Sequence, residues 1–386
     1  PALASPFEPR EPPPPWPFQQ SSFFDGWFLR LVDHENKFSF CLILGSLREH
    51  GKPCTRASGG YSSHFVGISY LDSKGKTHTY NFFPDPRAVS IDANGAPPVR
   101  RPSRSTPPNF RWSAAGVGEL LVQPESGTLE FSVPEASVKA KFHGRIPWSR
   151  SRPNKDGPEG WLAGTGLLPL HYFVHSFGSA AEYEFEAKHD KAEKCSGSGR
   201  LHMECNYGDM FPHAWVWGQG CSRPPTMATH LGDGSIGSGD IPADFQQLSF
   251  VLTGGQFRIG PLTSQAWVIA LRWGDEEWNF RTTDLDEVTT LQLSRKARAI
   301  RLRALSRCKT RLLEVRDVLV APEHSFGKPI AVPTHKGWST SPGCVESYNA
   351  AASFRCYHKE HGQWQLILEK QVPLAAMEFG GAYQST

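Results

Sequence analysis

One short stretch of the sequence combines a carboxylic acid, two amide side chains and two indole rings. Glu204 and Asn206 are followed closely by Trp215, Trp217 and Gln219. A carboxyl group surrounded by aromatic side chains has a raised pKa, because burial disfavours the anion. Such an acid can protonate an alkene, and the indole faces can stabilise the resulting cation. Glu204 is therefore our first candidate for a general acid, with the amides as groups that orient a substrate oxygen.

Two more carboxylic acids lie beside aromatic residues elsewhere in the chain. Asp25 precedes Gly26 and Trp27 and is the second candidate acid, and Glu378 is the third. Ordinary structural roles stay open for all three. An Asp before Gly often caps a turn or pairs with an arginine, Glu204 can belong to a buried ion pair, and Glu378 can end a strand. The tryptophans can likewise be plain core, since aromatic residues fill β-barrels in any case.

Histidines and basic residues form two further patterns that could bind a ligand. His171 and His175 are four residues apart on a predicted strand, which places them on one face. No third residue has the spacing of a metal ligand, so we favour hydrogen-bonded structural roles. Residues 295–311 contain eight basic residues and no acid. A solvated strand face is the simpler explanation, and contact with an anionic lipid surface or an acidic partner is the alternative.

The elements that position these residues follow from length and composition. The 386 residues suffice for two domains, and 39% hydrophobic and 20% charged residues are typical of a globular protein. The 36 glycines and 32 prolines favour turns, whereas 24 phenylalanines and 12 tryptophans fit pleated strands. A net charge of only +3 argues against nucleic acid as a partner, and no apolar stretch reaches the ~18 residues of a membrane-spanning helix. Eight cysteines without a CxxC pair predict buried thiols in a reducing compartment rather than a zinc site.

Segments with strand character recur along the whole chain, and no segment of ~12 residues has a 3.6-residue period. We predict strands at residues 27–32, 37–44, 64–71, 77–83, 129–133, 138–142, 171–177, 182–186, 214–219, 248–253, 266–273, 277–282, 289–293, 299–305, 312–320, 350–357 and 364–372. This spacing predicts an all-β protein with an antiparallel barrel or sandwich in each half. The predicted organisation is a Pro-rich extended arm at 1–20, an N-terminal domain at 21–225 and a C-terminal domain at 241–386.

Three separated motifs resemble those of the tocopherol cyclase family. Residues 23–28 read Phe-Phe-Asp-Gly-Trp-Phe, where the family has Phe-Phe-Glu-Gly-Trp-Tyr. Residues 204–208 read Glu-Cys-Asn-Tyr-Gly, followed by Phe-Pro and Trp-x-Trp-x-Gln, which is similar to the family's Glu-Lys-Asn-Trp-Gly, Phe-Pro and Trp-x-Trp-x-Gln. Residues 375–381 read Ala-Ala-Met-Glu-Phe-Gly-Gly and resemble a family ending, Ala-Ala-Val-Glu-Ile-Gly-Gly.

The resemblance covers nearly the whole chain and implies a fold, an activity and a site. The implied fold is two tandem lipocalin-like β-barrels that enclose an aromatic-walled space. The implied activity is the cofactor-free closure of a prenylated hydroquinone to a chromanol in a plastid, after removal of a targeting peptide. The implied ligand is an isoprenoid or prenylquinone, bound by a soluble or peripheral membrane protein. With Glu204 and Asp25 as acids, the expected substrate-binding residues are Trp27, Asn206, Tyr207, Trp215, Trp217, Gln219, His171 and Glu378.

Two departures fall in the most distinctive motif. Cys205 stands where the family has Lys, and Tyr207 stands where it has Trp. These changes favour an alternative to the enzyme, namely a non-catalytic subunit that binds a lipid or pigment or assembles into a plastid membrane complex. A third alternative keeps the fold and hydrates a carotenoid-like alkene.

Overall fold

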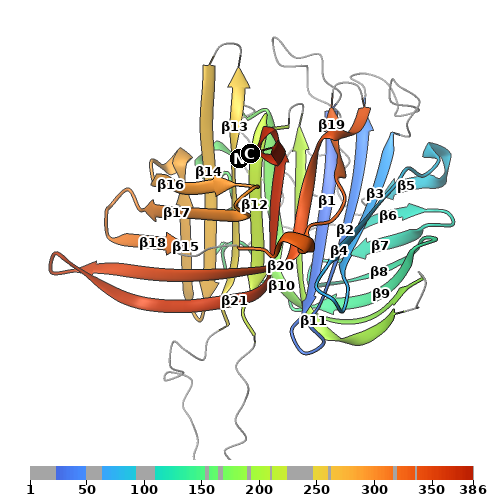
Figure 1. Ribbon diagram of the computed structural model, residues 1–386, viewed down its shortest axis with the longest axis horizontal. Helices are drawn as coiled ribbons and strands as arrows, with labels where there is room; N and C mark the ends of the chain where they lie inside the picture. Colours follow the sequence, from blue (N-terminus) through green and yellow to red (C-terminus); the bar gives the residue numbers. More distant parts are fainter. Residues whose placement is uncertain are drawn as a thin grey trace, which may run out of the picture.

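The protein is all-β, as predicted, with two large antiparallel sheets and a few short 3-10 turns (Figure 1). Its computed structural model describes residues 23–48, 63–92, 109–152, 156–163, 168–188, 193–208, 211–223, 247–259, 262–315, 320–334 and 337–385. The Pro-rich arm predicted at 1–20 lies outside these ranges. No helix within them has the length and apolar character needed to cross a membrane.

The first sheet has eleven strands in the order β4-β3-β2-β1-β11-β10-β9-β8-β7-β6-β5. They are β1 (Phe23–Asp33), β2 (Phe38–Arg48), β3 (His64–Leu71), β4 (Thr77–Phe82), β5 (Val89–Asp92), β6 (Phe110–Ala114), β7 (Gly118–Val122), β8 (Ser126–Ser132), β9 (Ala136–His143), β10 (Leu170–Ala187) and β11 (Glu193–Gly208). Within the described residues its edge strands β4 and β5 do not pair, so of the barrel or sandwich predicted for each half this sheet forms a curled half-barrel. On β4, the Asn81 amide donates a hydrogen bond to the Pro329 carbonyl and accepts one from the Ala331 N–H of the second half.

The second sheet has ten strands, of which nine follow the order β15-β14-β13-β12-β21-β20-β18-β17-β16, and β19 pairs with β20. They are β12 (Ala214–Cys221), β13 (Ser249–Ile259), β14 (Leu262–Trp273), β15 (Glu276–Arg281), β16 (Glu287–Ser294), β17 (Ala299–Leu305), β18 (Arg311–Val315), β19 (Ile330–Thr334), β20 (Gly337–Glu360) and β21 (Gln363–Gly381). The chain changes sheet between Gly208 and Ala214. Strand β12, which falls within the predicted domain 21–225, is thus part of the second sheet.

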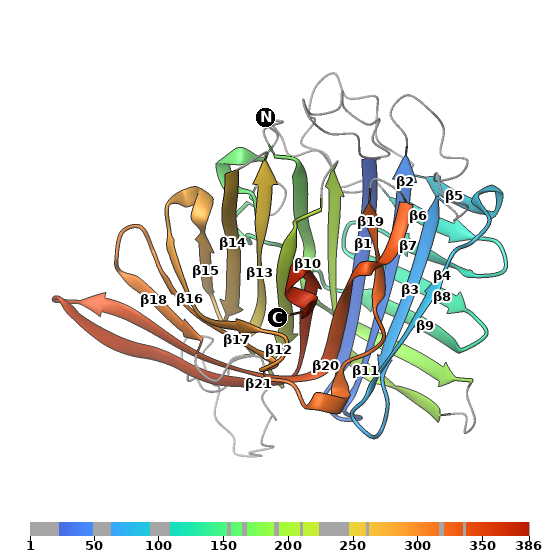
Figure 2. The same cartoon turned by 45° about the horizontal axis from the view of Figure 1, so that its top comes forward.

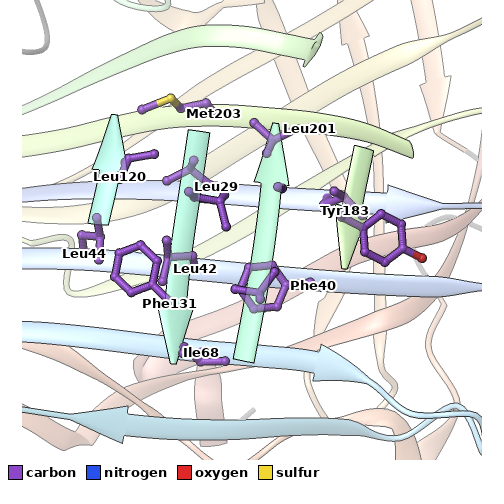
Figure 3. Packing of buried hydrophobic residues seen from close by; sticks show 14 of the residues in the cluster. Leu29, Phe40, Leu42, Leu44, Ile68, Leu120, Phe131, Tyr183, Leu201 and Met203 are labelled. Atoms are coloured by element: carbon purple, nitrogen blue, oxygen red, sulfur yellow. The ribbon is translucent and has the colours of Figure 1, made fainter. Parts of the chain in front are cut away.

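Each sheet has its own side-chain core on one face. In the first half, Leu29 and Leu42 from the long strands meet Leu120 and Phe131 from β7 and β8, and all four are buried (Figure 3). The second half has its own separate core, a cluster of buried apolar side chains that includes Phe250. The interiors of both halves therefore contain packed side chains.

The opposite faces of the long central strands pack against each other, with the first sheet on one side and the second on the other (Figure 2). Because side chains alternate along a strand, Leu29 of β1 enters the first core while Phe28 faces the second sheet. The rings of Phe28 and Trp217 lie 4.7 Å apart across this contact. Central strands such as β1 are consequently buried on both faces, which explains their nearly continuous apolar sequence.

Candidate functional site

A cavity of about 410 Å³ lies between the two sheets, at one end of their contact. Phe24 and Phe28 of β1 border it from the first sheet, and Trp215, Trp217 and Trp267 border it from the second. Its size and aromatic lining suit a small, mostly apolar ligand. The resemblance implies an aromatic-walled space inside the barrels, whereas the structure has this cavity between the two sheets and packed side chains inside each half.

Glu204 lies at this cavity with a side chain only 3% exposed. Its Oε2 atom accepts hydrogen bonds from the Tyr172 hydroxyl at 2.6 Å and from the Trp217 indole at 3.3 Å, and it lies 2.8 Å from Nε2 of His202. Burial and the adjacent Glu204 raise the pKa of Tyr172 well above its usual range. Period-two alternation on β11 places His202, Glu204 and Asn206 on the face toward the second sheet. Oε2 of Glu204 is therefore fully engaged as a hydrogen-bond acceptor.

Two further carboxyl groups, the fully buried Glu346 and the half-buried Glu378, occupy directly opposed positions on β20 and β21. The Trp215 indole donates a hydrogen bond to Glu378, and the Tyr348 hydroxyl donates one to Glu346. Burial, followed by the neighbouring Glu378 carboxyl, raises the pKa of Glu346 well above its usual range. Burial also raises the pKa of Glu378, although the hydrogen bond from Trp215 opposes the shift. Since two adjacent carboxylates repel each other, this pair retains a proton more readily than an exposed carboxyl does.

Of the two acids, Glu378 lines the cavity. A fully buried arginine, Arg30 of β1, lies near enough to Glu346 to attract its carboxylate. Arg30 donates to the side chain of Gln219 at 2.7 Å and to the Leu374 carbonyl at 2.5 Å. Its guanidinium also lies 5.3 Å from the centre of the Tyr348 ring. Burial lowers the pKa of Arg30, and the attraction of Tyr348 and Glu346 opposes that shift.

Six of the ten predicted site residues border the cavity: Glu204, Trp27, Asn206, Trp215, Trp217 and Glu378. Trp27 belongs to this set although its ring packs 4.9 Å from Phe110 in the first core.

Four predicted site residues do not border the cavity. Asp25 shares the face of β1 that carries Leu29, so it faces the first half. Tyr207 stacks on His171 at 4.7 Å, and Nδ1 of His171 lies 3.0 Å from the Glu159 carboxylate. Gln219 is held by Arg30. For Asp25, Tyr207 and His171 the reason is strand geometry, because neighbours in a sequence motif point to opposite faces of a strand. Gln219 shares the face of Trp215 and Trp217 but lies farther along β12, where Arg30 binds it.

Sequence reasoning missed Glu346, Tyr348, Arg30 and Tyr172 as parts of the site. The spacing Glu346-x-Tyr348 is a signal that two polar side chains share a strand face. The sequence does not show that Glu346 meets a second acid, because only the register of the β20–β21 hairpin brings it opposite Glu378, 32 residues later in the chain.

Comparisons with known proteins give a fold and no family. No protein-family model matches the chain, and no curated protein sequence matches it either. Among solved structures, CghA matches with a TM-score of 0.59 at 10% identity, over 100% of this chain and 98% of CghA. A Nitrosomonas europaea protein provisionally assigned as AttH reaches a TM-score of 0.47 at 11% identity, over 94% and 93% of the two chains. This chain therefore has the fold of CghA along its whole length.

Proposed function

We propose that this chain is a cyclase that closes a ring in an apolar, alkene-bearing substrate, with Glu378 as the proton donor. One observation carries the proposal. Glu378, a half-buried carboxyl group with a raised pKa, lines an aromatic cavity and is paired with the fully buried carboxyl of Glu346. General acids are effective when their pKa approaches the working pH, and a carboxyl needs burial to reach that range.

The chemistry requires one proton and no oxidant. The proton of Glu378 adds to a trisubstituted alkene and leaves a tertiary carbocation. A phenol oxygen of the same substrate attacks this cation and forms the C–O bond of the ring. The phenol proton then returns to the carboxyl pair, so the product is an isomer of the substrate. Trp215 and Trp217 are placed to stabilise the cation, because aromatic faces attract positive charge.

Within this proposal Glu204 has a positioning role. Its Oε2 atom already accepts bonds from Tyr172 and Trp217, so these groups form a fixed polar wall beside the apolar space. Asn206 adds an amide to the same wall. Such a wall suits the oxygen-bearing ring of a prenylated hydroquinone, the substrate class that the resemblance to tocopherol cyclases implies, and a plastid location would follow from it.

The alternative, a non-catalytic binding or assembly subunit, rested on two departures from the family motif. Cys205 lies buried in the first core, and Tyr207 packs against that core. Neither residue borders the cavity in the part of the chain that the structure describes. This placement favours the enzyme, because the substitutions leave the proposed proton donor and its aromatic surroundings unaltered.

The test is to incubate the purified protein with a prenylated hydroquinone and to look by chromatography and mass spectrometry for an isomeric chromanol. Glu378→Gln should lower turnover by roughly 10²-fold or more, because general acid catalysis contributes about that much. Glu369→Gln is the matched control, since Glu369 lies on the same strand β21 but is 49% exposed. Turnover that is equal in wild type and Glu378→Gln contradicts the assignment. Absence of turnover together with a co-purifying lipid or pigment supports the binding subunit instead.

A further inference from the structure

Two large apolar side chains are exposed to an unusual degree beside the cavity. Trp161 is 67% exposed and Leu285 is 65% exposed, more than any other large hydrophobic side chain in the described residues. Trp161 lies in the 3-10 turn Gly160–Leu162, and Leu285 follows the turn Thr282–Asp284. We call these two side chains the apolar rim.

The rim is continuous with the cavity. Pro158 and Glu159, just before the first turn, line the cavity, and so does Thr283 in the second. The two turns are bound to each other, because the Trp161 indole donates a hydrogen bond to the Thr283 carbonyl at 3.0 Å. Arg281 adds a bond of 3.3 Å to the carbonyl of Gly157. The rim is thus a fixed edge of the cavity formed by both halves of the molecule.

Leu285 holds an unfavourable backbone conformation at this edge. Its φ angle of 65° lies in the left-handed region, where a leucine is uncommon and Gly or Asn is favoured. An exposed leucine there gains nothing from packing in the folded protein. A gain in free energy from burying the Leu285 side chain in another apolar phase would explain why a leucine stands there.

Among the described residues, acidic and basic groups lie side by side next to the rim. Arg281 lies 3.2 Å from Asp284, and Asp286 accepts hydrogen bonds from the backbone of Arg281 and Arg307 at 2.8 Å. Glu159 contacts His171. Because charges of both signs are mixed at this edge, a neutral apolar surface fits it better than an anionic one.

We infer that the apolar rim inserts into the interfacial layer of a lipid bilayer, so that an apolar ligand passes from the lipid into the cavity. Trp is the side chain that most favours this layer, since its ring is apolar and its N–H is polar. The transfer of substrate rests on the proposed function, whereas the docking itself does not.

The experiment is flotation of the purified protein with phosphatidylcholine vesicles. Trp161→Ser and Leu285→Asn should each lower the partition coefficient by about tenfold, because each removes one inserted apolar side chain. Asn tolerates the left-handed conformation, so Leu285→Asn keeps the fold intact. Trp364→Ser is the control, as Trp364 is an exposed tryptophan on the distant β20–β21 hairpin. Binding should persist from about 0.1 M to about 0.5 M salt, where exposed charges are screened.

Three results overturn the inference: no flotation of the wild type, rim variants that float as well as the wild type, or binding that is lost at high salt. A comparison of substrates separates docking from catalysis. Leu285→Asn, which leaves the hydrogen bond between the two turns in place, should convert detergent-dispersed substrate normally and vesicle-embedded substrate poorly. Rim-dependent flotation without any chromanol leaves docking intact and contradicts the proposed function. Normal turnover together with flotation that does not depend on the rim contradicts docking and leaves the proposed function intact.

Discussion

At the scale of single residues, the surroundings of each carboxyl group decide which one can act as an acid. Oε2 of Glu204 is surrounded by the donors Tyr172 and Trp217, an arrangement that uses this oxygen to hold other groups in place. Glu378 instead faces a second acid, Glu346, and burial raises the pKa of both. A proton is therefore easier to keep on the pair than on an ordinary carboxyl group.

The raised pKa values of Glu346 and Glu378 predict that the stability of the fold depends on pH. A folded-state pKa above the unfolded value means that the folded protein binds more protons, so stability is greatest at low pH and falls as pH rises through the raised pKa. Glu346→Gln imitates the protonated form and should remove part of this fall. Each group contributes a slope of up to about 1.4 kcal/mol per pH unit within its window. Denaturant unfolding of wild type and Glu346→Gln at a series of pH values above the ordinary carboxyl range measures how the unfolding free energy changes with pH.

Glu369→Gln provides the control for this measurement, because the exposed Glu369 pairs with Arg355 at the surface. Its unfolding free energy should follow the wild type at every pH. A Glu346→Gln protein whose stability falls with pH as steeply as the wild type would show that Glu346 is ionised in the folded state.

At the scale of elements, close strand contacts fix the aromatic wall. Gly380 of β21 pairs with Trp215 of β12, and the indole of Trp215 lies over the glycine. A Cβ atom on Gly380 would collide with the Trp215 ring. The same indole donates the hydrogen bond to Glu378. The glycine thus allows the indole to reach the proposed acid.

Gly380→Ala should therefore displace the Trp215 ring, lower the unfolding free energy by about 1–3 kcal/mol and reduce turnover. Gly178→Ala in β10 is the matched control, since the nearest atoms to its added Cβ would lie 3.9 Å away. Urea unfolding and turnover of the two variants test this. Equal values for the two would mean that the contact between strand and ring is adaptable.

At the scale of the whole molecule, the site exists because two sheets pack face to face. Arg30 of the first sheet is fully buried and bonds to Gln219 and Leu374 of the second. A buried cation is costly unless its partners are in place, and removing one member leaves the others without compensation. The contact between the sheets is therefore polar at its centre and apolar around it.

Arg30→Met should lower the unfolding free energy by about 3–5 kcal/mol, because it removes the cation from a buried network. Arg355→Met, which removes a surface pair with Glu369, should cost less than about 1 kcal/mol. Thermal and denaturant unfolding measure both. A loss for Arg30→Met no larger than that for Arg355→Met would show that the network contributes little to holding the sheets together.

The sequence alone determined the all-β class and most of the strands, because alternation and turn residues are local properties of the chain. It did not predict β11, the strand that carries Glu204. It also pointed to Glu204, Trp215, Trp217 and Glu378, since aromatic residues beside acids are visible in short motifs. The sequence could not show which residues of one motif reach the cavity. Glu204 borders it, whereas Tyr207 lies on the opposite face of β11.

Only the tertiary structure decided where the cavity lies and which acids meet. Closure of a barrel depends on whether the distant strands β4 and β5 pair, and pairing of Glu346 with Glu378 depends on the register of a long hairpin. Both are contacts between residues far apart in the chain, and a local pattern contains no information about them. The cavity between the sheets is likewise a product of how two finished sheets pack, and the same packing brings Arg30 of the first sheet to the Leu374 carbonyl of the second.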